Sequence, residues 1–217
     1  MNQNSTVKTV TYINSNSYET LNSVGTETKY VWFVFHGMGY LSKYFLKYFK
    51  TLPSKENYII CPQAPSKYYL KEDFKHVGAS WLTKEETKES LVNVFSYLDA
   101  VWQSEAIGSD VKLMVFGYSQ GVSIASRWVA SRQIKCSQLV FYAGSIPNDL
   151  KKCDFAHLDQ NTRITYIYGD EDPYINADRA LLEQQKINKI FGTKTNQIQF
   201  KGGHEIKIEL LENLIVQ

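Results

Sequence analysis

The sequence predicts an α/β protein with a mainly parallel central sheet and helices on both of its faces. Apolar segments of strand length alternate with amphipathic segments of helix length along most of the chain. The strand-like segments are continuous apolar runs, which is typical of strands buried on both faces. A length of 217 residues fits one domain with a sizeable core, so we expect a single domain over residues 1–217.

The first quarter of the chain contains three expected strands and one expected helix. Segments 7–13 and 17–21 have the length and composition of short strands, and we expect them to pair as an antiparallel hairpin. Residues 30–37, YVWFVFHG, form an unbroken apolar run that ends in glycine, as expected for a strand buried on both faces. Residues 41–52 carry apolar side chains at helical spacing, which predicts a helix.

The next segments are expected to form a strand, a loop and a long helix. Residues 58–65 are a short apolar run that is stopped by prolines, and they predict a strand. Residues 66–80 are polar and aromatic and are expected to form a loop. Residues 83–106 predict an amphipathic helix that begins with a capping box of Thr83 and Glu86.

The second half of the chain continues the alternation of strands and helices. Strands are expected over residues 112–119, 138–144, 163–172 and 196–205. Helices are expected over residues 120–132, 177–191 and 206–217. In parallel sheets of this kind, ligands bind at the carboxyl ends of the strands, so the residues that directly follow strands are the candidates for function.

Composition and charge exclude several classes of protein. The formal net charge of +2 gives no strong field that would favour nucleic acid or an anionic membrane. The three cysteines, Cys61, Cys136 and Cys153, are widely spaced and form neither a zinc pattern nor a disulfide framework. The N-terminus lacks the pattern of a signal peptide, and no apolar run approaches the ~20 residues that span a bilayer. We therefore expect a cytoplasmic protein that has no cysteine-bound zinc, no nucleic-acid partner and no stable membrane insertion.

The stretch FGYSQGVSIA contains a G-x-S-x-G pattern centred on Ser119. The apolar run KLMVF precedes it and the helical pattern VSIASRWVA follows it, which is the strand–turn–helix context of a nucleophile elbow. Flanking glycines let the chain reverse sharply, and the helix N-terminus behind the serine favours developing negative charge. These features predict that Ser119 is a nucleophile.

A serine nucleophile needs a base within hydrogen-bond reach and an acid that orients the base. In this context the chain order is Ser, then Asp or Glu, then His. His204 follows an expected strand and two glycines and is the expected base, whereas His157 precedes a strand and is expected to be a surface residue. In the segment GDEDPYI we favour Asp172 as the acid because Pro173 helps to fix its backbone, with Asp170 as the alternative.

The segment FHGMGY follows another expected strand and predicts part of an oxyanion hole. Such a hole needs two backbone N–H donors. Gln120, the residue after the nucleophile, is expected to supply one, and Met38 in this loop is expected to supply the other. We expect His36 to steady this loop by packing rather than to take part in catalysis.

Taken together, these segments resemble the phospholipase/carboxylesterase family of α/β-hydrolases, which includes the acyl-protein thioesterases. The matching stretches FHGMG, CPQAP, GASW, GYSQG, YGDEDPYI and GGHEI occur in the order of the family and cover about residues 31–208. The resemblance implies an α/β-hydrolase fold without a large cap domain, a Ser119–Asp172–His204 triad, and oxyanion donors at Met38 and Gln120. Trp81 matches a tryptophan near the acyl site of the family, although a core tryptophan fits that position equally well.

The function expected from these residues is hydrolysis of carboxylic esters of small or medium acyl groups through an acyl-enzyme intermediate, without a cofactor. A thioesterase or lysophospholipase with the same triad is the first alternative, and a non-catalytic binding protein of the same fold is the second. Tyr40 and Val122 depart from common family residues, and the 66–80 segment is particular to this chain. The expected partner is a small-molecule ester, and the expected state is a monomer or homodimer.

Overall fold

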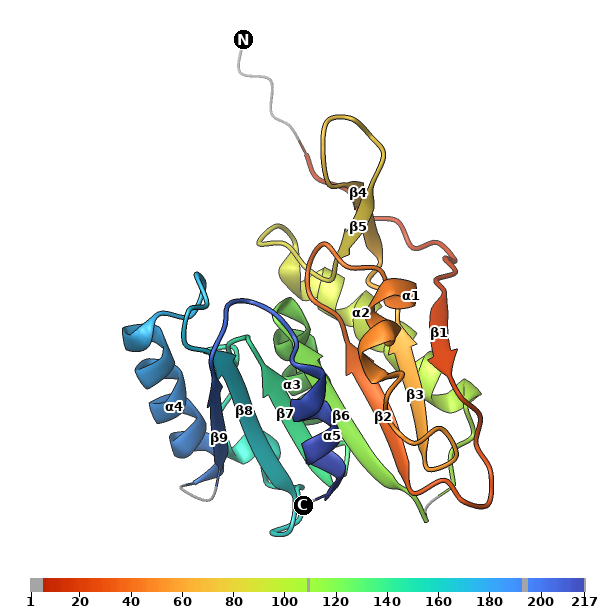
Figure 1. Cartoon of the computed structure of the whole chain (residues 1–217). Helices are drawn as coiled ribbons and strands as arrows, with labels where there is room; N and C mark the ends of the chain where they lie inside the picture. The colour runs from red at the N-terminus through yellow and green to blue at the C-terminus, as the bar shows by residue number, and fades with distance from the viewer. Residues whose placement is uncertain (1–5, 109, 193–194, 217) are drawn as a thin grey trace.

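A computed structural model describes residues 6–108, 110–192 and 195–216 and contains a seven-stranded sheet in the order β1-β3-β2-β6-β7-β8-β9 (Figure 1). Its strands are β1 (Tyr18–Leu21), β2 (Tyr30–Phe35), β3 (Asn57–Pro62), β6 (Lys112–Tyr118), β7 (Gln138–Tyr142), β8 (Arg163–Gly169) and β9 (Asn196–Phe200). The edge strand β1 pairs with β3 in antiparallel register, and the other paired strands of this sheet are parallel.

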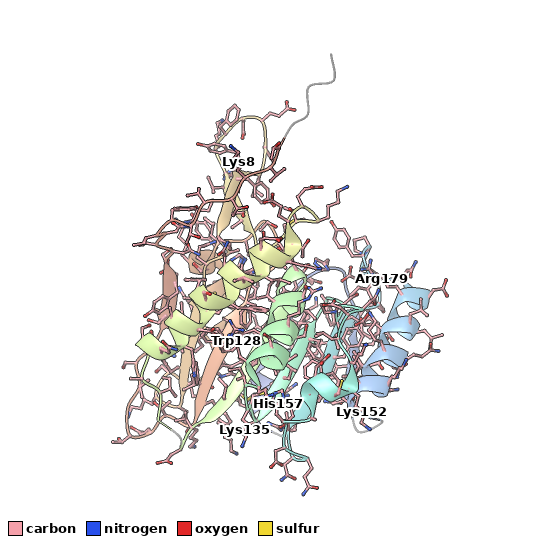
Figure 2. The ribbon with its side chains drawn as sticks, turned by 180° about the vertical axis from the view of Figure 1, so that it is seen from behind. Lys8, Trp128, Lys135, Lys152, His157 and Arg179 are labelled. Carbon is pink, nitrogen blue, oxygen red and sulfur yellow. The ribbon has the colours of Figure 1, made fainter. Side chains whose placement is uncertain are left out.

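Helices cover both faces of the sheet. They are α1 (Ser42–Phe45), the 3₁₀ helix η1 (Leu46–Phe49), α2 (Thr87–Ser104), α3 (Gln120–Arg132), the 3₁₀ helix η2 (Lys152–Phe155), α4 (Ala177–Phe191) and α5 (Ile208–Val216). Helices α2, α3 and α4 lie on one face, which is the near face in Figure 2, and α1 and α5 lie on the other. The predicted fold class is confirmed: a mainly parallel sheet between two layers of helices. Within the described residues, no helical cap is inserted above the sheet.

Aromatic packing joins α3 to the sheet and to α2. The Trp128 ring, labelled in Figure 2, stacks on Phe33 of β2 with ring centroids 4.7 Å apart. Its indole Nε1–H donates to Asp99 of α2 at 3.0 Å, and Arg132 pairs with the other oxygen of the same carboxylate at 2.7 Å. Trp128 and Phe33 are fully buried. This packing holds the helix that begins directly behind Ser119.

The strand order reverses next to β2. β3 lies on one side of β2, and β6, β7, β8 and β9 follow on the other side. Parallel strands end at the same edge of the sheet, so the loops after β2, β6, β8 and β9 meet there. This edge is the place where open α/β sheets bind their ligands.

The expected hairpin of residues 7–13 and 17–21 is wrong. Residues 7–13 form no strand and lie in solvent, with Val7, Val10 and Ile13 at least four-fifths exposed. Only Tyr18–Leu21 becomes a strand, and it pairs with the edge of the sheet at β3. A short hairpin that buries no apolar face has little stability of its own, whereas a sheet edge offers a ready-made partner.

The expected loop at 66–80 is also wrong, because it forms a small antiparallel hairpin. Its strands are β4 (Ser66–Tyr69) and β5 (Val77–Ser80), and the hairpin projects beyond the sheet (Figure 1). The base of the hairpin is tied to the loop after β2, since Gly39 N–H donates to Ala79 O at 2.8 Å. Local backbone pairing therefore forms here although the strands have no clear apolar pattern.

Two expected helix details are corrected. Segment 41–52 is broken into α1 and η1 rather than forming one helix. The capping box of Thr83 and Glu86 is absent, because Glu86 takes a left-handed conformation (φ 47°, ψ 40°) and its side chain caps nothing. The Thr83 hydroxyl instead accepts the N–H of Glu85, and α2 begins at Thr87. The last residue expected in the C-terminal helix, Gln217, lies outside the described residues.

Gly121 allows α3 to approach β2, and this contact generates a stability prediction. A Cβ atom at Gly121 would lie 2.1 Å from the Phe35 carbonyl oxygen, whereas a Cβ at Gly25 would meet nothing within 4 Å. We predict that Gly121→Ala lowers the free energy of unfolding by about 2 kcal/mol or more, because the backbone must move to make room for the added methyl group. The matched control Gly25→Ala should stay within about 0.5 kcal/mol of the parent. Urea unfolding measures both, and equal stability of the two variants would contradict the prediction.

Candidate active site

Ser119 occupies a strained turn between β6 and α3. Its backbone has φ 54° and ψ −118°, a conformation that costs a non-glycine residue about 1–3 kcal/mol. The turn is held from both sides: Ser119 N–H donates to Tyr142 O of β7 at 2.8 Å, and Val122 N–H donates to Ser119 O at 3.1 Å. The strand–turn–helix context predicted for this serine is therefore present.

Three of the predicted site residues form one chain of hydrogen bonds. His204 Nε2 lies 3.0 Å from Ser119 Oγ, and His204 Nδ1 lies 2.7 Å from Asp172 Oδ2. The Asp172 side chain is fully buried, whereas 19% of the His204 side chain is exposed. When Nδ1–H donates to the carboxylate, the lone pair of Nε2 points to the serine hydroxyl. This arrangement can accept a proton from Ser119.

In the acidic cluster after β8, Asp170 and Asp172 make different contacts. Asp172 directs one oxygen at His204 and accepts the Tyr174 N–H with the other, at 2.8 Å. Asp170, the alternative acid, is exposed and accepts the Gly202 N–H at 2.9 Å. Asp170 thus joins the loop after β8 to the loop after β9, which carries His204.

Two buried tyrosines support the histidine loop, and no sequence pattern marks either of them. The Tyr118 hydroxyl donates to the His204 carbonyl oxygen at 2.9 Å, and its ring centroid lies 5.2 Å from the imidazole. The Tyr142 hydroxyl accepts the Lys207 N–H at 2.9 Å. Burial raises the pKa of both hydroxyls well above their usual range, so both stay protonated. An isolated tyrosine in an apolar strand gives no sequence signal for such a contact.

The loop after β2 passes against the serine turn. A Cβ atom on Gly37 would lie 3.1 Å from the Ser119 Cβ, so the two segments are in close contact. Met38 and Gln120, the residues predicted to supply backbone donors, lie in this loop and at the start of α3. Neither backbone N–H donates to another residue in the described part of the chain. The role of these two N–H groups as oxyanion donors stays a prediction.

The Gln120 side chain joins the serine turn to the end of β5. Its Oε1 accepts the Trp81 N–H at 2.8 Å, and its Nε2 donates to the Leu82 carbonyl oxygen at 2.8 Å. The Trp81 indole N–H donates to the His36 carbonyl oxygen at 2.8 Å. Only 1% of Trp81 is exposed, which matches the core alternative for this residue. Contact between Trp81 and an acyl chain stays a prediction.

His36 is a buried hydrogen-bonding residue of the loop after β2. Its Nδ1–H donates to Gly37 O at 2.8 Å, and its Nε2 accepts the Ala64 N–H at 3.1 Å. Burial lowers the pKa of His36 to about 4, so the ring is neutral at pH 7. These contacts agree with the expected role of steadying the loop. His157 is half-buried rather than a surface residue, and it precedes β8 near the lower end of the view in Figure 2.

The arrangement of sheet and turn is that of an α/β-hydrolase. Residues 16–216 match the phospholipase/carboxylesterase family, so the chain belongs to this family and is a hydrolase of the esterase and thioesterase type. The resemblance stated from the sequence is confirmed. Within the described residues, no helix combines the length and apolar character needed to cross a bilayer, and no cluster of three or more His, Cys, Asp or Glu side chains could hold a metal ion.

Solved structures with the same fold include enzymes from plants and bacteria. Acyl-protein thioesterase 2 of Zea mays is 15% identical, with a TM-score of 0.69 over 92% of this chain and 96% of that one. The carboxylesterase of Mesorhizobium loti is 13% identical, with a TM-score of 0.69 over 92% and 93%. The phospholipase/carboxylesterase of Dyadobacter fermentans is 18% identical, with a TM-score of 0.65 over 95% and 99%. No curated protein sequence matches the chain.

The neutral, buried His36 generates a prediction about pH. The pKa of His36 is about 4 in the folded chain and about 6.5 when unfolded, so the unfolded state binds more protons between these values. Above pH 6.5, His36 makes its full contribution to the free energy of unfolding. This contribution falls by about 3 kcal/mol as the pH drops towards 4. The His36→Gln variant lacks this pH-dependent contribution. We predict that its free energy of unfolding approaches that of the parent as the pH falls from 7 to 4.

Urea unfolding at pH 7, 6, 5 and 4 measures this effect. The control is His76→Gln, which removes an exposed histidine of the β4–β5 hairpin. If the difference between His36→Gln and the parent stays constant over this pH range, His36 is not a neutral buried group.

Proposed function

We propose that this chain is a serine hydrolase that cleaves carboxylic esters of small or medium acyl groups. Ser119 is the nucleophile, His204 the general base and Asp172 the acid that orients the base. The observation that carries the proposal is the hydrogen-bond chain from Ser119 Oγ to His204 Nε2 at 3.0 Å and from His204 Nδ1 to Asp172 Oδ2 at 2.7 Å. The position of Ser119 on a strained turn at the carboxyl edge of the sheet strengthens the proposal.

In the acylation step, Ser119 Oγ attacks the carbonyl carbon of the ester while its proton passes to His204 Nε2. The carbonyl oxygen becomes an oxyanion that accepts hydrogen bonds from the backbone N–H groups of Met38 and Gln120. The tetrahedral intermediate collapses as the bond to the leaving oxygen breaks, and His204 gives that oxygen its proton. The products are an alcohol and an acyl-enzyme on Ser119.

In the deacylation step, water attacks the acyl carbon and loses a proton to His204 Nε2. The bond to Ser119 Oγ then breaks, and His204 returns the proton to the serine. Asp172 keeps the imidazole in one tautomer and stabilises its charged form in both steps. Burial of the carboxylate strengthens this interaction because little water competes with it.

The exposure of residues around the serine turn supports the proposed preference for small or medium acyl groups. Met38 is 60% exposed beside the turn, and within the described residues the projecting β4–β5 hairpin is the main insertion at this edge. A thioester substrate is the second candidate, because the similar Zea mays structure is an acyl-protein thioesterase. Oxygen esters and thioesters of equal acyl length separate the two. Cytoplasmic location and a monomeric or homodimeric state also stay predictions.

The first test is hydrolysis of p-nitrophenyl esters from acetate to decanoate. We predict activity in the parent with an optimum at short or medium chains, and a loss of about 10⁴-fold or more in Ser119→Ala. Urea unfolding of the variant verifies that it is folded. If a folded Ser119→Ala protein keeps the parent's rate, Ser119 is not the nucleophile. If the parent cleaves no ester or thioester at any length, a non-catalytic binding protein is the better account.

The second test compares the two aspartates of the GDED segment. Asp172→Asn should lower kcat by about 10⁴-fold, because the amide cannot stabilise the correct tautomer and charge of His204. Asp170→Asn should cost less than about 10-fold, because Asp170 accepts a backbone N–H and does not contact the imidazole. Equal losses in the two variants, or a larger loss in Asp170→Asn, would contradict the assignment of the acid.

A further inference from the structure

An exposed tyrosine ring contacts the His204 imidazole. The Tyr174 ring meets the imidazole in a T-shaped arrangement, with centroids 4.8 Å apart and planes at 75°. Tyr118 also contacts the imidazole, but Tyr118 is buried and its hydroxyl is bound to the histidine backbone. Tyr174 is 63% exposed. Tyr118 thus packs against the imidazole from the protein interior. Tyr174 is largely exposed, so it can contact a ligand.

Hydrogen bonds hold the backbone at Tyr174. Tyr174 N–H donates to Asp172 Oδ1 at 2.8 Å, and the next N–H, that of Ile175, donates to Asp172 O at 3.1 Å. Pro173 restricts the chain before Tyr174, and Ile175 is buried after it. The Tyr174 hydroxyl has no hydrogen-bond partner among the described residues. The same aspartate that orients the imidazole therefore holds the backbone that carries this exposed ring.

In the proposed reaction, the leaving group lies next to the imidazole that this ring contacts. His204 Nε2 protonates the leaving oxygen, so that oxygen must come within hydrogen-bond distance of Nε2. The carbonyl oxygen lies on the opposite side of the reacting carbon, towards the backbone donors of Met38 and Gln120. Substituents on the leaving oxygen therefore extend beside the imidazole, and Tyr174 is the exposed ring that contacts this imidazole.

We propose that Tyr174 is a specificity-determining residue that favours esters whose leaving group is an aromatic alcohol. This proposal rests on the proposed function, because it uses His204 as the group that protonates the leaving oxygen. Aromatic rings gain more from offset or edge-to-face contact with a tyrosine than saturated rings of equal size do. The selectivity acts in acylation, before the alcohol has left.

The test compares benzyl acetate with cyclohexylmethyl acetate. The two leaving alcohols are primary and of similar size and acidity, and they differ in whether the ring is aromatic. Both esters give the same acetyl-enzyme, so the ratio of their kcat/KM values reports only steps up to loss of the alcohol. We predict that Tyr174→Leu lowers the benzyl to cyclohexylmethyl ratio by about 3- to 10-fold. Tyr174→Phe, which keeps the ring, should hold the ratio within about twofold.

Two controls separate specificity from a structural role. Tyr44→Leu removes a similarly exposed ring on α1 and should leave the ratio unchanged. The rate of labelling by a fluorophosphonate, whose leaving group is fluoride, reports whether Ser119 and His204 stay competent in each variant. A purely structural role of Tyr174 would slow both esters and the labelling together and leave the ratio constant, which would overturn the proposal.

The failure of this proposal can be told apart from the failure of the proposed function. If Ser119→Ala abolishes hydrolysis of both esters but Tyr174→Leu leaves their ratio unchanged, only the role of Tyr174 is overturned. If the parent fails to cleave benzyl acetate, the role of Tyr174 is overturned too. The p-nitrophenyl series then decides whether the proposed function survives.

Discussion

At Ser119 the chain turns from β6 into α3 through a backbone conformation that non-glycine residues rarely adopt. The surrounding structure holds this turn in place. The Ser119 N–H donates to β7, and Gly121 sits where any Cβ would collide with the carbonyl oxygen at the end of β2. The turn thus depends on a close approach of α3 to the sheet. In return it holds the serine hydroxyl within 3.0 Å of the imidazole.

The site is assembled from loops that follow different strands and that are joined to one another by hydrogen bonds. Tyr142 links two of them, because its carbonyl oxygen accepts from Ser119 and its hydroxyl accepts from Lys207 beyond the histidine. The Gln120 side chain links the serine turn to the end of β5, and Asp170 links the loops after β8 and β9. Each loop is short, so the sheet largely fixes the relative positions of Ser119 and His204.

The parts of the fold predicted from sequence are those with strong local signals. The predicted helices 120–132 and 177–191 match the bounds of α3 and α4. Ser119 is marked by the G-x-S-x-G pattern, His204 by its place after a strand and two glycines, and Asp172 by the proline that follows it. The wrong predictions concern segments whose structure depends on strand pairing or on solvent exposure. Residues 7–13 lack an apolar partner, and 66–80 pair through backbone hydrogen bonds that composition does not reveal. The contacts of Tyr118 and Tyr174 with the imidazole depend on tertiary packing alone.

Reaction with a fluorophosphonate, followed by intact-mass and peptide mass spectrometry, tests whether Ser119 and His204 form a reactive pair. We expect one adduct per chain, located on Ser119, and no adduct when His204 is replaced by alanine in a folded protein. A serine hydroxyl that is hydrogen-bonded to an imidazole base is far more nucleophilic than other serine hydroxyls. An unmodified chain, or an adduct on a different serine, would contradict the claim that Ser119 and His204 form a reactive pair.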